Sequence, residues 1–328
     1  MQVLLTGGAG YIGSHTARLL VERGHEVVVL DRVEAGWLAA MVPVQAARGD
    51  LADKDLLDEL FESHRFDAVI HLAGDKSVET SLKDPGTYFA NNVGATLVLL
   101  GAMVRAGVRS VVFSSTAAVY GMDGSSPFTE GHVVDPQTPY GETKLMVERM
   151  LHWFDISHEL RSVSLRYFNA AGAASDSRIG EDWSKAINLV PMVMKAAAGR
   201  ADRLVVYGRD YPTPDGTAIR DYIHVMDIAD AHLRALDYLK RGGASQILNV
   251  GTGRGASVLE VIDAARRASG RPIPVEYAGR RPGDLAAVWA DSARANEVLG
   301  WQATHGLDEI VDSAWRWHAS QLNGSDPS

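Results

Sequence analysis

The stretch TGGAGYIG at residues 6–13 decides the fold, because it follows a short apolar run at residues 2–6 and opens a helical pattern. Three glycines spaced GxxGxxG between a strand and a helix are typical of a turn that binds a dinucleotide. Gly7 permits the tight turn, Gly10 lets backbone N–H groups approach a pyrophosphate, and Gly13 lets the helix pack closely on the strand. The turn therefore predicts a dinucleotide-binding site.

Asp31 supplies the second part of this prediction. It ends an apolar run at residues 26–31, one helix and one strand after the glycine turn. A carboxylate there can bind the hydroxyls of the adenosine ribose and repel a 2′-phosphate, which favours NAD over NADP. The adjacent guanidinium of Arg32 would tolerate a phosphate, but as a surface arginine it is expected to be solvated.

Apolar runs alternate with helical patterns from residue 2 to about residue 169, which is typical of βαβ units. The predicted strands are residues 2–6, 26–31, 68–73, 110–115 and 162–168. Their nearly continuous apolar character suits strands that are buried on both faces. The expected fold class is therefore α/β: a doubly wound parallel sheet (Rossmann fold) with a second, smaller α/β substrate lobe.

The expected domain division places the NAD-binding Rossmann domain at residues 1–169 and a second lobe at residues 170–328, which the family resemblance described below implies is a UDP-sugar-binding lobe. A strand-like run at residues 246–250 is followed by a glycine-rich turn. Such a run suits the same sheet, so a segment near residues 217–255 is expected to rejoin the first domain.

Composition and charge limit the classes of function. The 328 residues include no cysteine, which excludes disulfides and thiolate chemistry and fits a reducing compartment. A net charge of −9 argues against nucleic-acid binding, which needs a basic surface. No apolar run approaches the length of a membrane span, and the N-terminus does not resemble a signal peptide. We expect a cytoplasmic protein that binds neither nucleic acid nor a membrane and holds no metal.

Polar and small residues follow the predicted strand ends, where open α/β sheets bind their ligands. Asp50, which follows the place where a third strand of the sheet is expected, should lie near the adenine. The small residues within 72–74, at the end of the strand predicted at residues 68–73, would let a dinucleotide pass close to the backbone. The predicted cofactor contacts in these loops are Asp50, Leu51, Leu72, Ala73, Gly74, Lys76 and Asn91.

Tyr140 and Lys144 form a YxxxK pair that places both side chains on one face of a helix. A tyrosine serves as a base near pH 7 only if its pKa falls by roughly three units, and a neighbouring ammonium and a positive nicotinamide ring favour the phenolate. Thr116 ends the strand-like run at residues 110–115, so its hydroxyl can share a substrate proton with Tyr140 at the same sheet edge. These three residues are the predicted catalytic group.

These motifs resemble those of the extended short-chain dehydrogenase/reductase family over residues 3–317. The residues that carry the resemblance are TGGAGYIGSHT at 6–16, FSS at 113–115, VYG at 119–121, PYGETKLMVE at 139–148, LRYFN at 165–169, DYPTPDGT at 210–217, RDYIHV at 220–225 and RRPGD at 280–284. The resemblance adds Tyr11, Ile12 and Phe168 to the expected cofactor contacts, together with Tyr140 and Lys144.

The resemblance implies an isomerase that interconverts UDP-glucose and UDP-galactose. Tyr140 would take the proton of the sugar 4-hydroxyl while NAD removes hydride from C4. The 4-keto sugar would then turn over and receive the hydride on its other face. Lys144 would hold the nicotinamide ribose, and Thr116, where many relatives carry Ser, would bind the 4-oxygen. Relatives are often homodimers through helices like those at residues 92–104 and 140–154.

The resemblance also implies a UDP-hexose substrate, gripped at its nucleotide and held loosely at its hexose. Two arginines would bind the diphosphate through forked hydrogen bonds, and a short strand would line the uracil pocket. The implied substrate contacts are Thr116, Asn169, Asn188, Leu189, Val205, Val206, Tyr207, Arg220, Arg281, Asp284 and Val288.

Two departures from the family pattern matter. The segment at residues 32–49 is shorter than in typical relatives and lacks their Asn-rich turn after Asp31, which affects the expected ribose contacts. Val288 stands where some relatives carry Tyr, which narrows the sugar pocket, and others carry a small residue. We hypothesise that Val288 leaves room for UDP-N-acetylglucosamine and UDP-N-acetylgalactosamine.

Alternative functions are tested by the same residues. A nucleotide-sugar 4,6-dehydratase needs an acid beside the strand-end hydroxyl, but Ala117 and Ala118 follow Thr116. A UDP-glucuronate 4-epimerase or decarboxylase needs a carboxylate-binding residue in the sugar pocket, and this alternative stays open. A non-catalytic NAD-sensing regulator could keep the glycine turn, but such proteins usually lose the Tyr or the Lys.

Overall fold

The computed structural model describes residues 1–121, 125–183, 187–281 and 283–323. Within these residues, seven parallel strands form one sheet in the order β11-β6-β5-β4-β1-β2-β3. They are β1 (Gln2–Thr6), β2 (Glu26–Asp31), β3 (Gln45–Arg48), β4 (Ala68–His71), β5 (Ser110–Thr116), β6 (Arg161–Tyr167) and β11 (Gln246–Val250). The order runs outward from β1 in both directions, which confirms the predicted doubly wound α/β fold.

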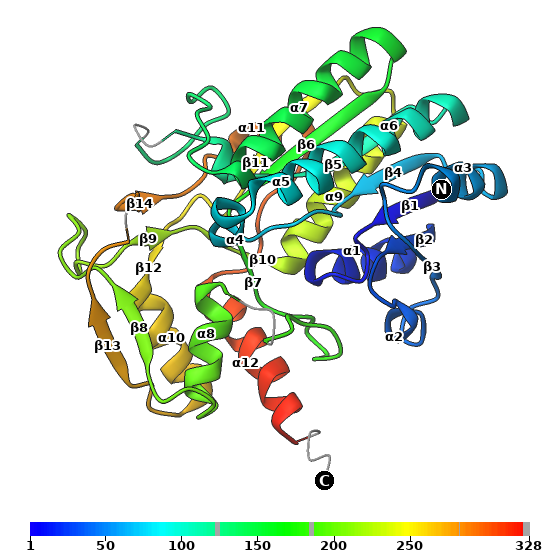
Figure 1. Ribbon diagram of the computed structural model, residues 1–328. Helices are drawn as coiled ribbons and strands as arrows, with labels where there is room; N and C mark the ends of the chain where they lie inside the picture. The colour runs from blue at the N-terminus through cyan, green and yellow to red at the C-terminus, as the bar shows by residue number, and fades with distance from the viewer. Residues whose placement is uncertain (122–124, 184–186, 282, 324–328) are drawn as a thin grey trace.

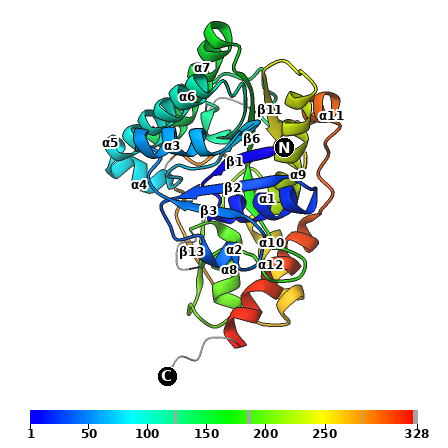
Figure 2. The same ribbon diagram turned by 90° about the vertical axis from the view of Figure 1, so that its right-hand side faces the viewer.

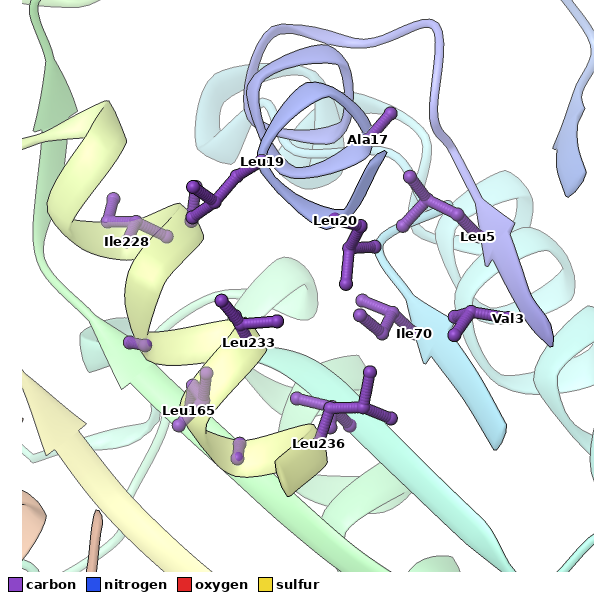
Figure 3. Packing of buried hydrophobic residues seen from close by; sticks show 14 of the residues in the cluster. Val3, Leu5, Ala17, Leu19, Leu20, Ile70, Leu165, Ile228, Leu233 and Leu236 are labelled. Atoms are coloured by element: carbon purple, nitrogen blue, oxygen red, sulfur yellow. The ribbon is translucent and has the colours of Figure 1, made fainter. Parts of the chain in front are cut away.

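Helices cover both faces of this sheet (Figures 1 and 2). On one face lie α1 (Tyr11–Glu22) and α9 (Val225–Lys240), and on the other lie α3 (Lys54–Ser63), α6 (Ala95–Ala106) and α7 (Pro139–His158). Because neighbouring strand residues point to opposite faces, Val3 and Leu5 pack under α1 and α9 while Leu4 packs on the other side. Figure 3 shows the first of these cores, where Leu20 of α1 and Leu236 of α9 approach Ile70 of β4.

Shorter elements connect the layers of the first domain. They are α2 (Gly36–Ala39), α4 (Val78–Lys83), α5 (Pro85–Tyr88), the π-helical turn η1 (Phe89–Gly94) and the 3₁₀ turn η2 (Ala117–Val119). The stretch Pro85–Ala106, with a mean hydropathy of 1.3, is long and apolar enough to cross a membrane by length and composition. Part of its apolar character is explained by packing, because Leu99, Leu100 and Met103 are buried in the core between α6 and the sheet.

A second lobe forms around another core. Its helices are α8 (Leu189–Ala197), α10 (Val258–Ser269) and α12 (Leu307–Asn323), which pack against the parallel pair of β8 (Leu204–Tyr207) and β13 (Val275–Ala278). Between the lobes lie the short strands β7 (Asn169–Ala171), β9 (Ile219–Arg220), β10 (Tyr222–His224), β12 (Ala256–Ser257) and β14 (Ala287–Val288). The remaining helix, α11 (Ala293–Leu299), packs against α9 and β11 at the edge of the large sheet. Figure 1 shows the second lobe below the carboxyl ends of the large sheet.

The structure differs from the sequence expectation at two strands. The strand predicted at residues 68–73 ends at His71, so Leu72 and Ala73 already belong to the following loop. Residues 45–48 form an edge strand that no apolar run announces, since its residues are mostly exposed. Residues 225–250 lie inside the segment expected to rejoin the first domain. They form β11, which is the edge strand of the large sheet, and α9, which covers one face of that sheet.

Candidate active site

The glycine turn lies between β1 and α1 and is packed so closely that side chains do not fit. Gly7 has a φ of +74°, and a Cβ atom there would lie 2.6 Å from the backbone nitrogen of Ala73. A Cβ atom at Gly13 would lie 2.2 Å from the carbonyl oxygen of Gly7. The turn therefore brings α1 and the loop after β4 against the end of β1, the close approach that a bound dinucleotide requires.

The N-terminus of α1 offers N–H groups to an anion. Gly10 is the N-cap residue of this helix and has no side chain to cap it. No acidic residue stands in the first turn, which lies wholly in the described part of the chain. Aligned peptide dipoles give such a terminus a partial positive charge. Tyr11 and Ile12 are its first residues, and the Tyr11 hydroxyl donates to the Gly172 carbonyl at 2.6 Å. This cradle fits the pyrophosphate of NAD.

Asp31 joins the glycine turn to the end of β2. One carboxylate oxygen accepts from the Ala9 N–H and the other from the Val33 N–H, both at 3.0 Å. The carboxylate is therefore fixed beside the turn, where ribose hydroxyls would be bound.

Arg32 is not merely solvated, in contrast to the expectation. Its guanidinium pairs with Asp50 at 3.1 Å and donates to the Asn91 side-chain oxygen at 3.1 Å. Asn91 in turn donates to Asp75 at 2.7 Å. The predicted contacts Asp50 and Asn91 thus lie together at one rim, but the Leu51 side chain is buried in the core under α3 and can offer a cofactor only its backbone.

The loop after β4 is fastened to α7. The side-chain oxygen of Asn92 accepts from the Asp75 N–H at 2.8 Å, and its amide donates to the Thr143 hydroxyl at 3.0 Å. A Cβ atom at Gly74 would lie 2.9 Å from that same oxygen and 3.6 Å from the Lys144 ammonium. The predicted cofactor contacts Leu72, Ala73 and Gly74 therefore lie in a loop that passes close to Lys144 of α7.

Lys76 lies at the outer end of this loop and reaches the second lobe. Its ammonium is 3.5 Å from a carboxylate oxygen of Glu181, whose side chain is buried. Burial raises the pKa of the Glu181 carboxyl, against the opposing effect of Lys76. Lys76 is thus placed between the predicted cofactor and substrate residues.

Tyr140, Lys144 and Thr116 lie where α7 meets the end of β5 (Figure 1). The helix begins after the N-cap residue Thr138, whose hydroxyl accepts from the Gly141 N–H at 3.2 Å. The Lys144 ammonium donates to the Ser114 carbonyl at 2.9 Å. Thr116 ends β5, where its hydroxyl accepts from the Ala118 N–H at 3.2 Å and faces the Tyr140 phenol, whose pKa it lowers. The three predicted catalytic residues are therefore brought together.

Burial does not favour Tyr140 as a base. It raises the pKa of the phenol, and Thr116 offsets only part of that effect. Burial also lowers the pKa of Lys144 to about 8, while Asp75 and Glu148 act in the opposite direction. The expected lowering of the Tyr140 pKa must then come from positive charges beside the phenol, which are the Lys144 ammonium and a bound nicotinamide ring.

The predicted diphosphate residues lie at the face of the second lobe. Arg220 pairs with Asp284 at 3.1 Å, and the Arg281 guanidinium stacks 4.1 Å from the centre of the Tyr207 ring. Asn169 donates from its side chain to the Asp221 carbonyl at 3.0 Å. Asn188 is exposed at the start of α8, and Leu189, its first residue, is partly buried.

Strand β8 divides the three residues predicted for the uracil pocket. Val205 and Tyr207 point to the exposed side, whereas Val206 is 1% exposed and packs in the core of the second lobe. Because alternate residues of a strand face opposite sides, Val206 can offer a uracil pocket only its backbone.

Val288 and Phe168 lie together although they are far apart in sequence. Both are partly buried against a small cluster that includes Val119, Tyr120 and Phe128. Val288 also pairs in register with Arg220. The predicted sugar-pocket residue thus adjoins a predicted diphosphate residue.

Sequence reasoning missed Asp221, which organises this region. Its buried carboxylate accepts from the Thr252 hydroxyl at 2.6 Å and from the Ala290 N–H at 3.1 Å, and its own N–H donates to the Val288 carbonyl at 3.0 Å. The available signal was its place in the RDYIHV motif at residues 220–225. In the described residues, no group of three or more His, Asp or Glu side chains is arranged to hold a metal ion.

Comparisons with known proteins point to one family. The model of the NAD dependent epimerase/dehydratase family matches residues 3–251. A UDP-glucose 4-epimerase of Halalkalibacterium halodurans is 46% identical over 325 residues, which cover 99% of this chain and 97% of that protein.

Two solved structures are similar over their full length. The UDP-glucose 4-epimerase from Stenotrophomonas maltophila, with bound NAD and formylated UDP-arabinopyranose, has a TM-score of 0.96 at 40% identity and covers 99% of this chain and 100% of its own. The UDP-glucose 4-epimerase from Bifidobacterium longum, in complex with NAD+ and UDP, has a TM-score of 0.92 at 40% identity with the same coverage, 99% and 100%.

Proposed function

Since this chain belongs to the NAD dependent epimerase/dehydratase family, we propose that it is an isomerase that interconverts UDP-glucose and UDP-galactose with NAD as its cofactor. The observation that carries the proposal is the meeting of Tyr140, Lys144 and Thr116 at the sheet edge that also holds the glycine turn. The relatives crystallised with NAD and with UDP or a UDP-sugar support the choice of both ligands.

In this proposal the reaction occurs at C4 of the hexose. When bound, NAD accepts hydride from C4 and returns it. Tyr140 accepts the proton of the 4-hydroxyl and later gives it back, while the Thr116 hydroxyl hydrogen-bonds the 4-oxygen. Lys144 binds the nicotinamide ribose, and its charge favours the phenolate that burial disfavours.

The second lobe grips the nucleotide in this proposal. Arg220 and Arg281 bind the diphosphate, while Asn169, Asn188 and Asp284 hold the remaining polar groups. Val205 and Tyr207 face the uracil. The hexose itself is held loosely, because it must present its two faces to the same hydride carrier in turn. The domain division at residue 169, with the segment near residues 217–255 returning to the NAD-binding domain, fits these roles.

The test is to incubate the purified protein with UDP-galactose, without added NAD, and to measure UDP-glucose. We expect turnover, because the cradle retains the cofactor through purification. Tyr140→Phe should lose turnover while keeping bound NAD, which is measured after denaturation of the protein. Absence of turnover even with added NAD, or a fully active Tyr140→Phe protein, would contradict the proposal.

Val288 bears on the range of substrates. Its side chain is partly buried beside Phe168, so it leaves more room at the sugar pocket than a tyrosine would. We expect comparable turnover of the N-acetylated and plain UDP-hexoses, and a Val288→Tyr variant that keeps only the plain pair. Failure of the parent protein to act on UDP-N-acetylglucosamine, together with a sharp gain in Val288→Ala, would contradict this. A UDP-glucuronate 4-epimerase is tested in the same assay with UDP-glucuronate.

We also propose that the protein is a cytoplasmic homodimer. The dimer is supported by the outer face of α6 and α7, where the large apolar side chains of Leu97, Trp153 and Ile156 are 52%, 63% and 61% exposed. These two helices lie side by side on the outside of the sheet (Figure 2). A second copy would remove these side chains from water.

A further inference from the structure

One face of α7 meets the end of β5 through polar contacts. Tyr140, Lys144 and Glu148 follow each other at intervals of four residues, which places them in a row along the helix. The Lys144 ammonium donates to the Ser114 carbonyl at 2.9 Å, and the Ser115 hydroxyl donates to a Glu148 oxygen at 2.5 Å. The third member of the row, Tyr140, bonds to Thr116. Three successive residues of β5 are therefore each fastened to α7.

Glu148 is the member of this row that the proposed reaction does not use. Its side chain is 2% exposed, and the Arg166 guanidinium binds it in a fork, with distances of 2.9 and 2.5 Å. Arg166 lies on β6 and also stacks 5.0 Å from the centre of the Tyr120 ring. Both carboxylate oxygens thus have fixed partners, and the ionised form is the one that this arrangement favours.

Stability alone does not account for this ion pair. Burying two charges costs several kcal/mol per ion, and well-packed apolar residues often replace such a pair without loss. The neighbouring residues Val147 and Leu151 of α7 pack into an apolar core. A role in the chemistry next to it would explain why this interface holds charges.

The groups that face Lys144 show what that role is. Asp75, in the loop after β4, and Glu148 contribute negative charge. His71 of β4 also faces it, but burial and the ammonium lower the His71 pKa to about 3, so the ring is neutral. Tyr88 of α5 and Tyr167 of β6 face Tyr140. Glu148 is the negative group that is built into the catalytic helix itself.

We propose that Glu148 is a positioning residue for the epimerisation. Its carboxylate, held by Arg166 and Ser115, fixes α7 against β5 and keeps Lys144 protonated at the height of Tyr140. This inference rests on the proposed function for its catalytic meaning, whereas its electrostatic part is measurable on the protein alone.

The test replaces both charges at once, because Glu148→Gln alone would leave Arg166 buried without a partner and destabilise the fold. The first variant is Glu148→Met with Arg166→Met, and a polar neutral pair, Glu148→Gln with Arg166→Gln, is the second. The control is Asp155→Asn with Arg161→Gln. That ion pair, 3.3 Å long, joins the same helix to the start of β6, and its side chains are 18% and 48% exposed, against 2% and 4% for Glu148 and Arg166. Thermal unfolding identifies the variants that fold.

Two measurements are made on the folded variants. In the pH dependence of kcat, we expect the alkaline limb to move to lower pH by roughly half to one unit, because Lys144 loses the charge of Glu148, which acts on it more strongly than that of Arg166. In lysine-selective ¹³C NMR, the Lys144 resonance, identified by its absence in Lys144→Met, should titrate at correspondingly lower pH. The control should keep both midpoints.

A uniform drop in kcat with both midpoints unchanged would overturn the proposal and leave the pair a purely structural one. If the parent protein epimerises nothing, the proposed function fails, but the NMR midpoint still decides whether Glu148 holds the Lys144 charge. An unchanged midpoint in either folded neutral variant rejects that part.

Discussion

Lys144 is kept charged at a site that opposes its charge. Its side chain is buried, and burial lowers its pKa to about 8, although Asp75 and Glu148 counteract part of that effect. An ammonium with a lowered pKa is a better partner for a phenolate than an exposed lysine, because its charge is poorly screened by water. The same burial means that the catalytic lysine works against the stability of the fold.

This residue gives a pH-dependent prediction. An unfolded lysine keeps its proton up to its ordinary pKa, so between pH 8 and about 10.4 the unfolded chain binds more protons than the folded one. The destabilisation is thus complete below pH 8 and relieved as the pH rises. The free energy of unfolding of Lys144→Met should therefore exceed that of the parent at pH 7 by up to about 3 kcal/mol. The difference should shrink towards pH 10.

Urea unfolding at several pH values measures this difference, and Lys83→Met serves as the control, because Lys83 is exposed and pairs with Glu79, which is also exposed. A Lys144→Met protein that is less stable than the parent at pH 7 would mean that the hydrogen bond to Ser114 outweighs desolvation.

The residues that sequence could locate are those whose chemistry follows local spacing. Gly7, Gly13, Tyr140 and Lys144 belong to short motifs that define both conformation and role. Glu148 stands in the same helical motif, but an acid on a helix is usually a solvated charge, so nothing in the sequence marks it as buried. Its partner Arg166 comes from a different strand, and such a pairing requires the fold.

At the scale of an element, β8 shows how a strand assigns roles. The apolar run Leu204–Tyr207 was sufficient to predict a strand, but not which of its side chains reach a ligand. That choice depends on which face meets α8 and α10, a property of tertiary packing.

This alternation gives a paired prediction. Val206→Ala should cost about 2 kcal/mol of stability, because it removes a buried side chain and leaves a cavity, and should leave KM for the UDP-sugar nearly unchanged. Val205→Ala should raise KM for the UDP-sugar and change stability little, since Val205 is 36% exposed on the opposite face. Thermal unfolding and steady-state kinetics on the two variants compare them directly. A larger KM effect from Val206→Ala would show that the faces are assigned wrongly.

At the scale of the whole molecule, charge and ligand oppose each other. The chain carries a net charge of −9, yet NAD and the UDP-sugar are both diphosphates. Long-range attraction cannot gather them, so local cations must hold them. The candidate groups are the N-terminus of α1 for the cofactor and Arg220 and Arg281 for the substrate.

Arg281 tests this division of charge. Its guanidinium is exposed and held over Tyr207, free to turn toward a phosphate, whereas Arg267 pairs with Asp308 on α12. Arg281→Met should weaken UDP binding by about tenfold or more, measured by calorimetry, because a charge-assisted hydrogen bond is lost. Arg267→Met should leave the affinity unchanged. Equal losses in both variants would indicate a general effect of net charge.

The fold class of the whole chain could be predicted because the strand–helix alternation and the glycine turn are local in sequence. The way the lobes meet could not. The Tyr11 hydroxyl bonds to the Gly172 carbonyl, Arg18 of α1 pairs with Asp176 at 2.8 Å, and Lys76 approaches Glu181. Each tie joins residues more than a hundred positions apart, and no periodicity encodes such partners.

The position of β11 at the sheet edge has a consequence for the life of the chain before it is finished. This strand pairs with β6 along residues 163–167, but it is made only after the intervening segment of the second lobe. While the ribosome is still translating that segment, β6 has an open edge that could pair with another nascent chain. This protein would therefore need protection by chaperones that act late in its synthesis, rather than by those that bind the first part of the chain to emerge.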